Sequence, residues 1–420
     1  MTTLSTIIEA LESRGLLFQI SDREALVEKS QKERLTVYAG FDPTADSLHI
    51  GNLLPIVALM RFQKCGHVPI ALVGGATGLI GDPSGKAAER TLNTEDVVKE
   101  WTHKLKVQLS RFLDFDCENA AQMVNNYDWI SKFDVITYMR DVGKYFTVNY
   151  MLNKDSVENR IEKGISYTEF GYMILQAFDF MHLNDNHGCN VQIGGSDQWG
   201  NITAGLELIR KKTGKEAFGV TFPLITKADG TKFGKTESGT IWLDADKTSP
   251  YEFYQFWLNV DDRDVIKLIK FYTFVEDMAS LEEAVANQPE KREAQKVLAN
   301  EVTTLVHGAD AAIRAQNISV ALFGGNVKEL SALELDEAYR AVPSGEVSEV
   351  LGMSLVDLLI QTNLATSKRQ ARESLSSGGI YINGQQHSGE DRTIEASDLL
   401  FGNYLVLRKG RKNYFFVKVV

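Results

Sequence analysis

Short apolar and β-branched runs alternate with longer stretches of helical periodicity along the first half of the chain. Four runs predict buried strands, at residues 35–38, 69–73, 191–193 and 222–225. Three stretches between them predict helices, at residues 50–64, 94–112 and 168–182. Buried strands that alternate with helices favour a parallel sheet covered by helices, so we expect an α/β fold in this half.

The second half of the chain has a different pattern. Residues 249–315 show helical periodicity with few strands, and residues 321–352 contain glycine and proline with little periodicity, which indicates a linker. Further on, Ser367 is placed to cap a helix and Gln370 to complete a capping box. The run 380–384 ends on Asn-Gly, the strongest short signal for a hairpin turn. The tail is therefore predicted to be a small α+β domain.

Charge is divided unevenly along the chain. The 420 residues carry a net charge of −11, which by itself would repel a polyanion. Residues 353–420, however, hold nine lysines and arginines against six aspartates and glutamates. This local basic surplus predicts a polyanion-binding domain at the end of the chain.

The composition favours a protein of the cytoplasm. The longest apolar run, 53–60, is far shorter than the roughly 20 residues that a membrane span needs, and the N-terminal stretch lacks the features of a signal peptide. The three cysteines are widely spaced, as expected in a reducing compartment. His182, His187 and Cys189 lie near one another, but no fourth ligand stands at a zinc spacing, so we expect no zinc site.

The turn after the first predicted strand has the features of an anion site. The stretch 38–52 leads from that strand into a helix, and a helix N-terminus offers free N–H groups at the positive end of its dipole. Gly51 allows close approach to the backbone, and His49 and Asn52 can donate hydrogen bonds to phosphate. An ordinary strand–turn–helix connection with incidental polar residues is the alternative.

A glycine-rich loop follows the second predicted strand. Residues 74–86 resemble a phosphate-binding loop, but the spacing of Gly81 and Gly85 is one residue too short for a Walker A motif, and Lys86 is followed by alanine. The glycines still indicate close backbone approach to a ligand or to another strand. Asp82 is the acceptor within this loop, and a simple turn aspartate is the alternative.

The predicted helix 168–182 is apolar on nearly every side and should be buried. Tyr172, Gln176 and Asp179 nevertheless fall on one narrow stripe, at spacings of i, i+4 and i+7. Because buried polar groups need partners, this stripe predicts a small polar ligand. A satisfied internal network of hydrogen bonds is the alternative.

Two further loops carry polar residues. The loop 194–201 follows a predicted strand, where ligands bind in open α/β sheets, and offers Asp197 for a sugar hydroxyl and Gln198 for an amide-type contact. The loop 227–239 is rich in glycine and contains Lys232 and Lys235, which predicts a mobile cationic segment. A solvated surface loop would account for the lysines alone.

Together these features resemble class I aminoacyl-tRNA synthetases. The segment 49–52 is similar to the HIGH signature of that class, and the segment 232–236 is similar to its KMSKS signature. Each motif is degenerate by itself, but their order and separation around an α/β domain are far more specific. The strings 38–44, 194–201 and 227–235 are similar to the bacterial tyrosyl branch.

The resemblance covers essentially the whole chain, because the tail 367–384 is similar to a small RNA-binding domain shared with a ribosomal small-subunit protein. It implies four parts: a Rossmann-like catalytic domain at 1–225 with a connective insertion at about 125–190, a signature-lysine loop and α-helical domain at 226–320, a linker at 321–352, and an RNA-binding domain at 353–420.

The resemblance also implies roles for individual residues. Tyrosine binding would fall to Tyr38, Asp82, Tyr172, Gln176, Asp179 and Gln198. ATP binding would fall to Gly40, Asp42, His49, Gly51, Lys86, Gly195, Asp197 and Lys235. Catalysis by stabilising the phosphates would fall to Thr44, His49, Asn52, Lys232, Lys235 and Thr236. RNA binding would fall to Lys368, Arg369, Arg372, Arg408, Lys409, Arg411 and Lys412.

Two positions depart from the family pattern. Asn52 stands where the HIGH signature has its second histidine, which predicts a weaker or differently shaped phosphate contact. Ala39 stands where some relatives have a cysteine near the ribose, which predicts that one hydrogen bond is missing.

The implied activity is that of a tyrosine–tRNA ligase, in which the tyrosine carboxylate attacks the α-phosphate of ATP and the tyrosyl group then passes to tRNA(Tyr). Positioning and charge stabilisation would drive the reaction, with Mg²⁺ accompanying ATP. The family also implies a homodimer, and residues 130–152 are apolar enough to contribute an interface.

Three alternatives stay open at this point. A tryptophanyl enzyme is disfavoured by the pair Tyr38 and Asp179 and by the RNA-binding tail. A non-catalytic RNA-binding protein derived from a synthetase is disfavoured by the two signature lysines, and a P-loop kinase by the failed Walker spacing.

Overall fold

The computed structural model describes residues 6–85, 92–154, 157–158, 161, 164–231, 233–236, 239–323, 326–410 and 413–420. The chain forms two compact units. The first contains Met1–Asp244 and Asp261–Glu283, and the second contains Ala245–Val260 and Ala284–Val420.

A six-stranded sheet forms the centre of the first unit, in the strand order β1-β6-β5-β2-β3-β4. Its strands are β1 (Gln19–Ile20), β2 (Thr36–Phe41), β3 (Val68–Val73), β4 (Gln122–Asn125), β5 (Val191–Gly195) and β6 (Phe218–Phe222). All neighbours pair in parallel except β1, which runs antiparallel to β6. The predicted parallel α/β fold is therefore confirmed.

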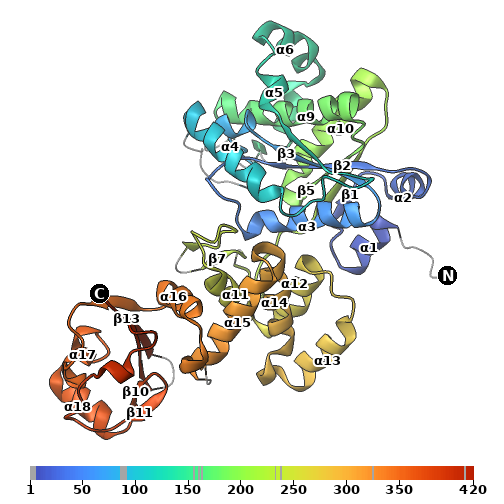
Figure 1. Ribbon diagram of the computed structural model, residues 1–420. Helices are drawn as coiled ribbons and strands as arrows, with labels where there is room; N and C mark the ends of the chain where they lie inside the picture. The colour runs from blue at the N-terminus through green and yellow to red at the C-terminus, as the bar shows by residue number, and fades with distance from the viewer. Residues whose placement is uncertain are drawn as a thin grey trace. The chain divides into compact units, whose positions relative to one another are not determined.

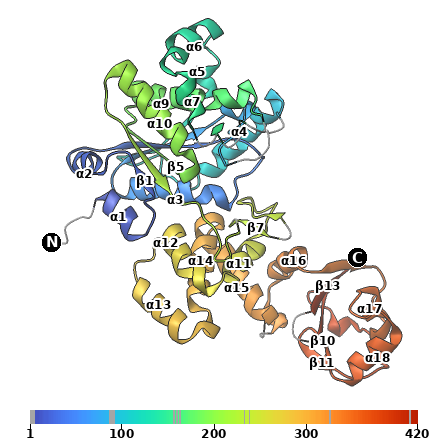
Figure 2. The ribbon, with the colours of Figure 1, turned by 180° about the vertical axis from the view of Figure 1, so that it is seen from behind.

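Helices cover both faces of this sheet, with α9 and α10 on one side and α3 on the other (Figures 1 and 2). The helices of the unit are α1 (Ile7–Ser13), α2 (Arg23–Lys32), α3 (Ile50–Lys64), α4 (Glu95–Leu109), α5 (Tyr127–Ile130), α6 (Val135–Asp141), α7 (Val148–Leu152), α9 (Tyr167–His187), α10 (Trp199–Thr213) and α12 (Asp262–Tyr272). Helix α13 (Met278–Asn287) spans the boundary between the units.

The predicted strand at 222–225 was misplaced. Strand β6 ends at Phe222, and Pro223 follows it without an N–H group to continue a ladder. The residues that form the strand, Phe218 to Phe222, include a glycine, which weakened the apolar pattern in the sequence. The three predicted helices all form, and α9 runs further than expected, to a left-handed Gly188.

The order of the strands creates a switch point in the sheet. From β2 the chain proceeds outward to β3 and β4, and it then returns to place β5 on the opposite side of β2. Tyr38 of β2 and Gln192 of β5 are direct neighbours in the register. Ligands of open α/β sheets bind where the carboxyl ends of such neighbouring strands diverge, so the fold itself indicates where a site lies.

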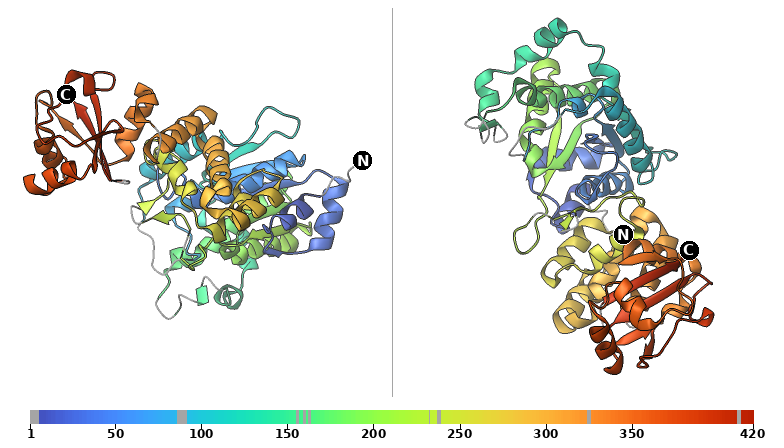
Figure 3. Two further views of the ribbon diagram at one scale, coloured as in Figure 1. Left: turned by 90° about the horizontal axis from the view of Figure 1, so that it is seen from below. Right: turned by 90° about the vertical axis from the view of Figure 1, so that its left-hand side faces the viewer.

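The second unit combines helices with a five-stranded sheet, whose order is β11-β10-β12-β13-β9; Figure 3 shows these strands in orange and red. Its helices are α11 (Pro250–Leu258), α14 (Glu293–His307), α15 (Ala309–Phe323), α16 (Ala332–Ala341), α17 (Leu355–Gln361) and α18 (Lys368–Ser376). Its strands are β9 (Ser344–Val347), β10 (Ile380–Ile382), β11 (Gln385–His387), β12 (Tyr404–Lys409) and β13 (Asn413–Val419).

Residues 321–352, which the sequence suggested as a linker, contain regular structure. Ser331 caps α16 in a full capping box with Glu334, and β9 pairs in parallel with β13. Strand β9 is short and contains Gly345, so its apolar pattern was too weak to be recognised in the sequence. Its pairing partner lies some seventy residues further on and was invisible locally.

The local signals of the tail were largely correct. Ser367 Oγ accepts a hydrogen bond from the backbone N–H of Gln370 and caps α18. The Gln370 side chain, however, accepts from Thr366 N–H rather than from Ser367, so the reciprocal half of the predicted capping box is absent. Asn383 and Gly384 both adopt positive φ, as a type I′ hairpin between β10 and β11 requires.

Candidate active site

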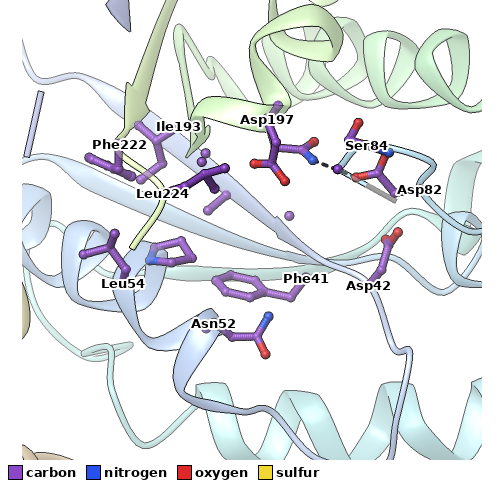
Figure 4. Close-up of a pocket in the computed structure, with 18 of the residues that line it drawn as sticks. Phe41, Asp42, Asn52, Leu54, Asp82, Ser84, Ile193, Asp197, Phe222 and Leu224 are labelled. Carbon is purple, nitrogen blue, oxygen red and sulfur yellow. Dashed lines mark hydrogen bonds between the residues drawn. The ribbon is translucent and has the colours of Figure 1, made fainter. Parts of the chain in front are cut away.

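A cavity of about 470 Å³ opens at the switch point of the sheet in the first unit. It lies within the size range of small-molecule sites. Figure 4 shows Asp42, Asp82 and Asp197 around this cavity, each from a different loop that follows a strand. The lining is therefore acidic and suits a ligand that carries positive charge or many donors.

The deepest polar group of the cavity is the hydroxyl of Tyr38. The Tyr38 side chain is buried, and its hydroxyl has no hydrogen-bond partner within the described part of the chain. Burial, and then the charge of Asp179, hold the pKa of Tyr38 above its ordinary value, so the group stays protonated. A buried hydroxyl without a partner costs free energy, which makes Tyr38 a strong candidate for a ligand contact.

Asp179 of α9 is the buried carboxylate at the same end of the cavity. Asn126 Nδ2 donates to its Oδ2 at 2.9 Å, and Trp129 Nε1 donates to its Oδ1 at 2.8 Å. Asn126 and Trp129 were not identified from the sequence, because they lie at the start and inside of the one-turn helix α5 that follows β4, where no motif marks them. The two donors fix the orientation of the carboxylate.

This carboxylate provides a test by pH. Burial raises the pKa of Asp179 to about 7, although the hydrogen bonds from Asn126 and Trp129 act in the opposite direction. The resemblance implies a tyrosine phenol at this carboxylate, and because only the ionised form accepts a phenol proton well, we expect kcat/KM for tyrosine to fall as the pH drops through about 7. The measurement is ATP–pyrophosphate exchange at limiting tyrosine between acidic and mildly alkaline pH.

The other titratable side chain beside this group is His182, whose ring stacks on Trp129 with centroids 4.3 Å apart, although burial lowers the pKa of His182 from its ordinary value. The His182→Gln variant is therefore the matched control, and it should keep the inflection of the profile. A flat profile for the unmodified protein, or an inflection that disappears in His182→Gln, would show that Asp179 is not the titrating group.

A second polar cluster surrounds Asp42. Tyr172 donates its hydroxyl proton to Asp42 Oδ2 at 2.7 Å, and Thr77 donates to Oδ1 at 2.6 Å. A Cβ atom on Gly74 would lie 2.0 Å from Asp42 Oδ1, so the pairing requires glycine there. The resemblance assigns Asp42 to ATP, and in the structure Asp42 both lines the cavity and accepts from Tyr172.

Asn126 joins the two clusters. Its Nδ2 donates both to Thr77 Oγ1 at 2.9 Å and to Asp179 Oδ2 at 2.9 Å. A continuous chain of hydrogen bonds therefore runs from Asp179 through Asn126 and Thr77 to Asp42 and Tyr172. The predicted polar stripe on α9 thus lines the cavity and also takes part in an internal network of hydrogen bonds. The two interpretations of the stripe, a ligand site and an internal network, are therefore compatible.

A third cluster gathers the remaining predicted tyrosine-site residues. Gln198 Nε2 donates to Asp82 Oδ2 at 2.7 Å, and Gln176 Nε2 donates to Gln198 Oε1 at 3.2 Å. The buried Asn201, which the sequence did not single out, donates to the side-chain oxygens of Gln176 and Gln198 and to Ser84. Gln176 and Gln198 line the cavity in orientations set by these hydrogen bonds, and Asn201 supports them without lining it.

The predicted anion site forms at the start of α3. His49 is the N-cap residue, and its Nδ1 accepts from Gly51 N–H at 3.0 Å. In the neutral ring the proton therefore resides on Nε2. Asn52 Oδ1 accepts from His49 N–H at 3.0 Å, so the asparagine completes the capping box and its amide nitrogen is left to donate. Asn52, which replaces the second histidine of the HIGH signature, thus still caps the helix and still offers a hydrogen-bond donor.

Asp197 lies where two glycines allow close approach. A Cβ on Gly195 would meet Asp197 Oδ1 at 2.6 Å, and a Cβ on Gly85 would lie 3.4 Å from Oδ2. Both glycines and Asp197 line the cavity, as do Gly40 and Thr44. The predicted ATP-binding residues in this part of the chain therefore converge on one site.

Several predicted cationic residues fall outside the described part of the chain. They are Lys86, Lys232, Arg411 and Lys412, and the side chains of Lys235 and Thr236 also lie outside it. The backbone of these last two forms β7 (Lys235–Thr236), which pairs with β8 (Gly239–Thr240).

The described basic residues of the tail form a separate surface in the second unit. On α18, Lys368, Arg369 and Arg372 are exposed, and each approaches one carboxylate. Such surface ion pairs contribute little to stability. On β12, the Arg408 guanidinium lies 3.9 Å from the ring centre of Tyr381, and Lys409 Nζ donates to Leu364 O.

Within the described residues, no group of three or more potential ligands is placed to hold a metal ion. His187 Nδ1 instead lies 2.8 Å from Gln122 Oε1, and Cys189 is buried with its thiol against Val191 O. No described helix is long and apolar enough to cross a membrane.

The fold and the cavity define a class I tRNA synthetase, and the family described as tRNA synthetases class I (W and Y) matches residues 29–324. A second family, the C-terminal domain of the SYY-like tyrosine–tRNA ligases, matches residues 334–417. The chain is 59% identical over 419 residues to tyrosine–tRNA ligase 1 of Bacillus subtilis, covering 99% of each chain. It belongs to the tyrosine–tRNA ligases, the ATP-dependent synthetases of that family.

Other relatives agree with this assignment. The tyrosine–tRNA ligase of Geobacillus stearothermophilus is 56% identical over 416 residues, covering 98% of this chain and 99% of that protein. A C-terminally truncated mitochondrial tyrosyl-tRNA synthetase from Aspergillus nidulans has a similar structure, with a TM-score of 0.70 and 32% identity over 76% of this chain and 94% of that one. The P-loop kinase and tryptophanyl alternatives are thereby excluded.

Proposed function

We propose that the chain activates L-tyrosine with ATP to tyrosyl adenylate and pyrophosphate, and then transfers tyrosine to the 3′ end of tRNA(Tyr) with release of AMP. The observation that carries this proposal is the buried, unpaired hydroxyl of Tyr38 at the same end of the cavity as the carboxylate of Asp179. A phenol satisfies both groups at once, since its O–H donates to Asp179 and its oxygen accepts from Tyr38. Amino-acid-dependent ATP–pyrophosphate exchange across the twenty amino acids tests the assignment.

The ammonium group of tyrosine would bind at the opposite end of the same polar network. Tyr172 already donates its proton to Asp42, so its oxygen is oriented to accept from a cation. Asp82, Gln176 and Gln198 supply further acceptors on the neighbouring wall. In this arrangement Gln198, which follows Asp197 in the same loop, would lie close to the reacting carboxylate.

ATP would bind across the carboxyl ends of the strands. The ribose would contact Asp197 and Gly195, and the phosphates would lie at the N-terminus of α3 beside His49 and Asn52. Thr44 and the signature lysines complete the set of donors in this proposal. The reaction needs no protein nucleophile, because the carboxylate of tyrosine attacks the α-phosphate directly, and the protein contributes alignment and charge stabilisation.

Mg²⁺ would enter with ATP. This ion keeps several waters and is usually held through substrate phosphates with one or two carboxylates. The acidic residues of the cavity could supply such a contact.

We propose a homodimer, as the family resemblance implies, and an exposed apolar surface in the first unit supports it. No residue of α6 is buried, and Val135 and Ile136 are 69% and 70% exposed. Met139 and Val148 add to this surface. Apolar groups clustered in this way usually mark an interface, and we propose that a second copy of the chain covers them. The unpaired cysteines are consistent with the reducing cytoplasm as its location.

The tail is proposed to bind tRNA through phosphate contacts. The donors on this small domain are the exposed Lys368, Arg369 and Arg372, together with Arg408, whose guanidinium lies over the ring of Tyr381. Arg411 and Lys412 belong to the same proposal. The boundary of that domain needs revision. A cut at Gly352 would separate β9 from β13 and remove the partners of Val347 and Val350 in the core of the tail.

We therefore predict the result for a chain that ends at Phe323. It should keep tyrosine-dependent ATP–pyrophosphate exchange, because every described residue of the cavity precedes that point. It should lose most tRNA charging at ordinary salt, because the basic surplus of the tail is gone. The two assays on full-length and shortened protein check this. The proposal that the tail is a separable tRNA-binding domain fails if shortening removes both activities or neither.

A further inference from the structure

The loop that carries the signature lysines is attached to the first unit at both ends. Its second end pairs with the turn that contains His49. Ile50 N–H donates to Ile241 O at 3.1 Å, Leu243 N–H donates to Leu48 O at 2.8 Å, and His49 and Trp242 form an antiparallel bridge. The end that follows the lysines is therefore fixed directly to the start of α3.

The first end of the loop is held by two side chains of α12. Asp264 Oδ2 accepts from Ala228 N–H at 2.8 Å, and Lys267 Nζ donates to Thr226 O at 3.0 Å. Lys267 Nζ also lies 3.5 Å from Asp264 Oδ1. The Asp264 side chain is 7% exposed, so its carboxylate is buried against these partners. A buried carboxylate with a backbone donor and a lysine forms a stronger attachment than an exposed surface pair.

Helix α12 is itself fixed to α3. Arg61 of α3 and Arg14 both donate to the carbonyl oxygens of Lys270 and Thr273 at the end of α12. The Tyr272 hydroxyl donates to Ile50 O at 3.4 Å. Cationic groups at a helix C-terminus satisfy its unpaired carbonyls and its dipole. The helix therefore provides a rigid support whose position is set by the same α3 that begins at His49.

We propose that Asp264, supported by Lys267, is a positioning residue that sets the first end of the lysine loop relative to the N-terminus of α3. The inference rests on the proposed function, in which the loop lysines act on the phosphates of ATP. Neither side chain lines the cavity. Asp264 acts through Ala228 and Lys267 through Thr226, and loss of Asp264 should disturb activation of tyrosine while leaving the tyrosine pocket intact.

The variants separate the two contacts. Asp264→Ala removes the acceptor for Ala228 N–H, whereas Asp264→Asn keeps one oxygen for that bond and loses only the charge beside Lys267. We expect Asp264→Ala to lower kcat for tyrosine activation roughly tenfold to a hundredfold, as for a lost charge-assisted hydrogen bond, with KM for tyrosine within about twofold. Asp264→Asn should recover most of the rate. Glu282→Gln, which breaks the exposed pair of Glu282 with Lys270, is the matched control and should change neither value.

A readout that does not depend on activity accompanies the kinetics. Trypsin cleavage at Lys227, next to the attachment, should be faster in full-length Asp264→Ala than in the unmodified protein or in Glu282→Gln. Unchanged cleavage would overturn the attachment itself. Two results for Asp264→Ala would overturn the positioning role. One is faster cleavage with an unchanged kcat for tyrosine activation. The other is a rise of KM for tyrosine together with a loss of thermal stability. If the unmodified protein showed no tyrosine-dependent exchange, the proposed function would fail while the cleavage result still decided the attachment.

Discussion

L-Phenylalanine is expected to support ATP–pyrophosphate exchange about 10⁴–10⁵ times less efficiently than L-tyrosine, a magnitude already established for tyrosyl-tRNA synthetases as a class and adopted from them. The physical reason is visible in the site. Without a phenol hydroxyl, Tyr38 keeps a buried O–H with no partner, and Asp179 loses the donor that favours its charged form. The measurement is kcat/KM for each amino acid at saturating ATP.

Substitution of Tyr38 separates this explanation from simple steric selection. Tyr38→Phe removes the orphaned hydroxyl, so it should lower kcat/KM for tyrosine and leave the small value for phenylalanine unchanged or raised. Cys189→Ala is a matched control, because this thiol is buried in the same hydrophobic cluster but bonds to Val191 O. Comparable use of phenylalanine and tyrosine by the unmodified protein would contradict the site assignment.

Loss of either signature lysine should lower the rate of tyrosine activation by about 10²–10³, the usual effect of removing one contact made in the transition state. Lys232→Ala and Lys235→Ala are each expected to lower kcat with little change in KM for tyrosine, because charge builds on the phosphates only as pyrophosphate leaves. Pre-steady-state measurement of tyrosyl adenylate formation checks this.

Lys227→Ala supplies the comparison, since Lys227 belongs to the same loop but precedes the signature. Its rate should remain near that of the unmodified protein. Near-normal activation by both Lys232→Ala and Lys235→Ala would contradict the role of the lysines. An equal loss in Lys227→Ala would instead indicate a general dependence on the charge of the loop.

Local sequence patterns were sufficient for the elements and for the type of chemistry. The period of the apolar residues predicted α3 over its full extent, and α4 and α9 to within a few residues. The Asn383-Gly384 turn followed from backbone preference alone, because positive φ at two successive residues favours asparagine and glycine. The stripe of Tyr172, Gln176 and Asp179 identified polar groups on a buried helix, which is a property of spacing.

Sequence patterns failed where the determining contact is distant along the chain. Strand β9 was assigned to a linker because its pairing with β13 is what makes it a strand. The role of Asp42 beside Tyr172 could not be read locally, since its two partners come from the loop after β3 and from α9. Asn126 and Trp129 carry no motif and matter only because the fold brings them against Asp179.

The sequence by itself thus determined helices α3, α4 and α9, three of the four predicted strands, that polar loops follow these strands, and that the basic surplus lies in the tail. These properties depend on residues close together in the chain. The tertiary structure alone decided which side chains share a hydrogen bond, how the lysine loop is attached to α12, and which buried polar atom remains unpaired. These depend on distances between residues that are remote in the sequence, and the sequence of one protein does not give such distances.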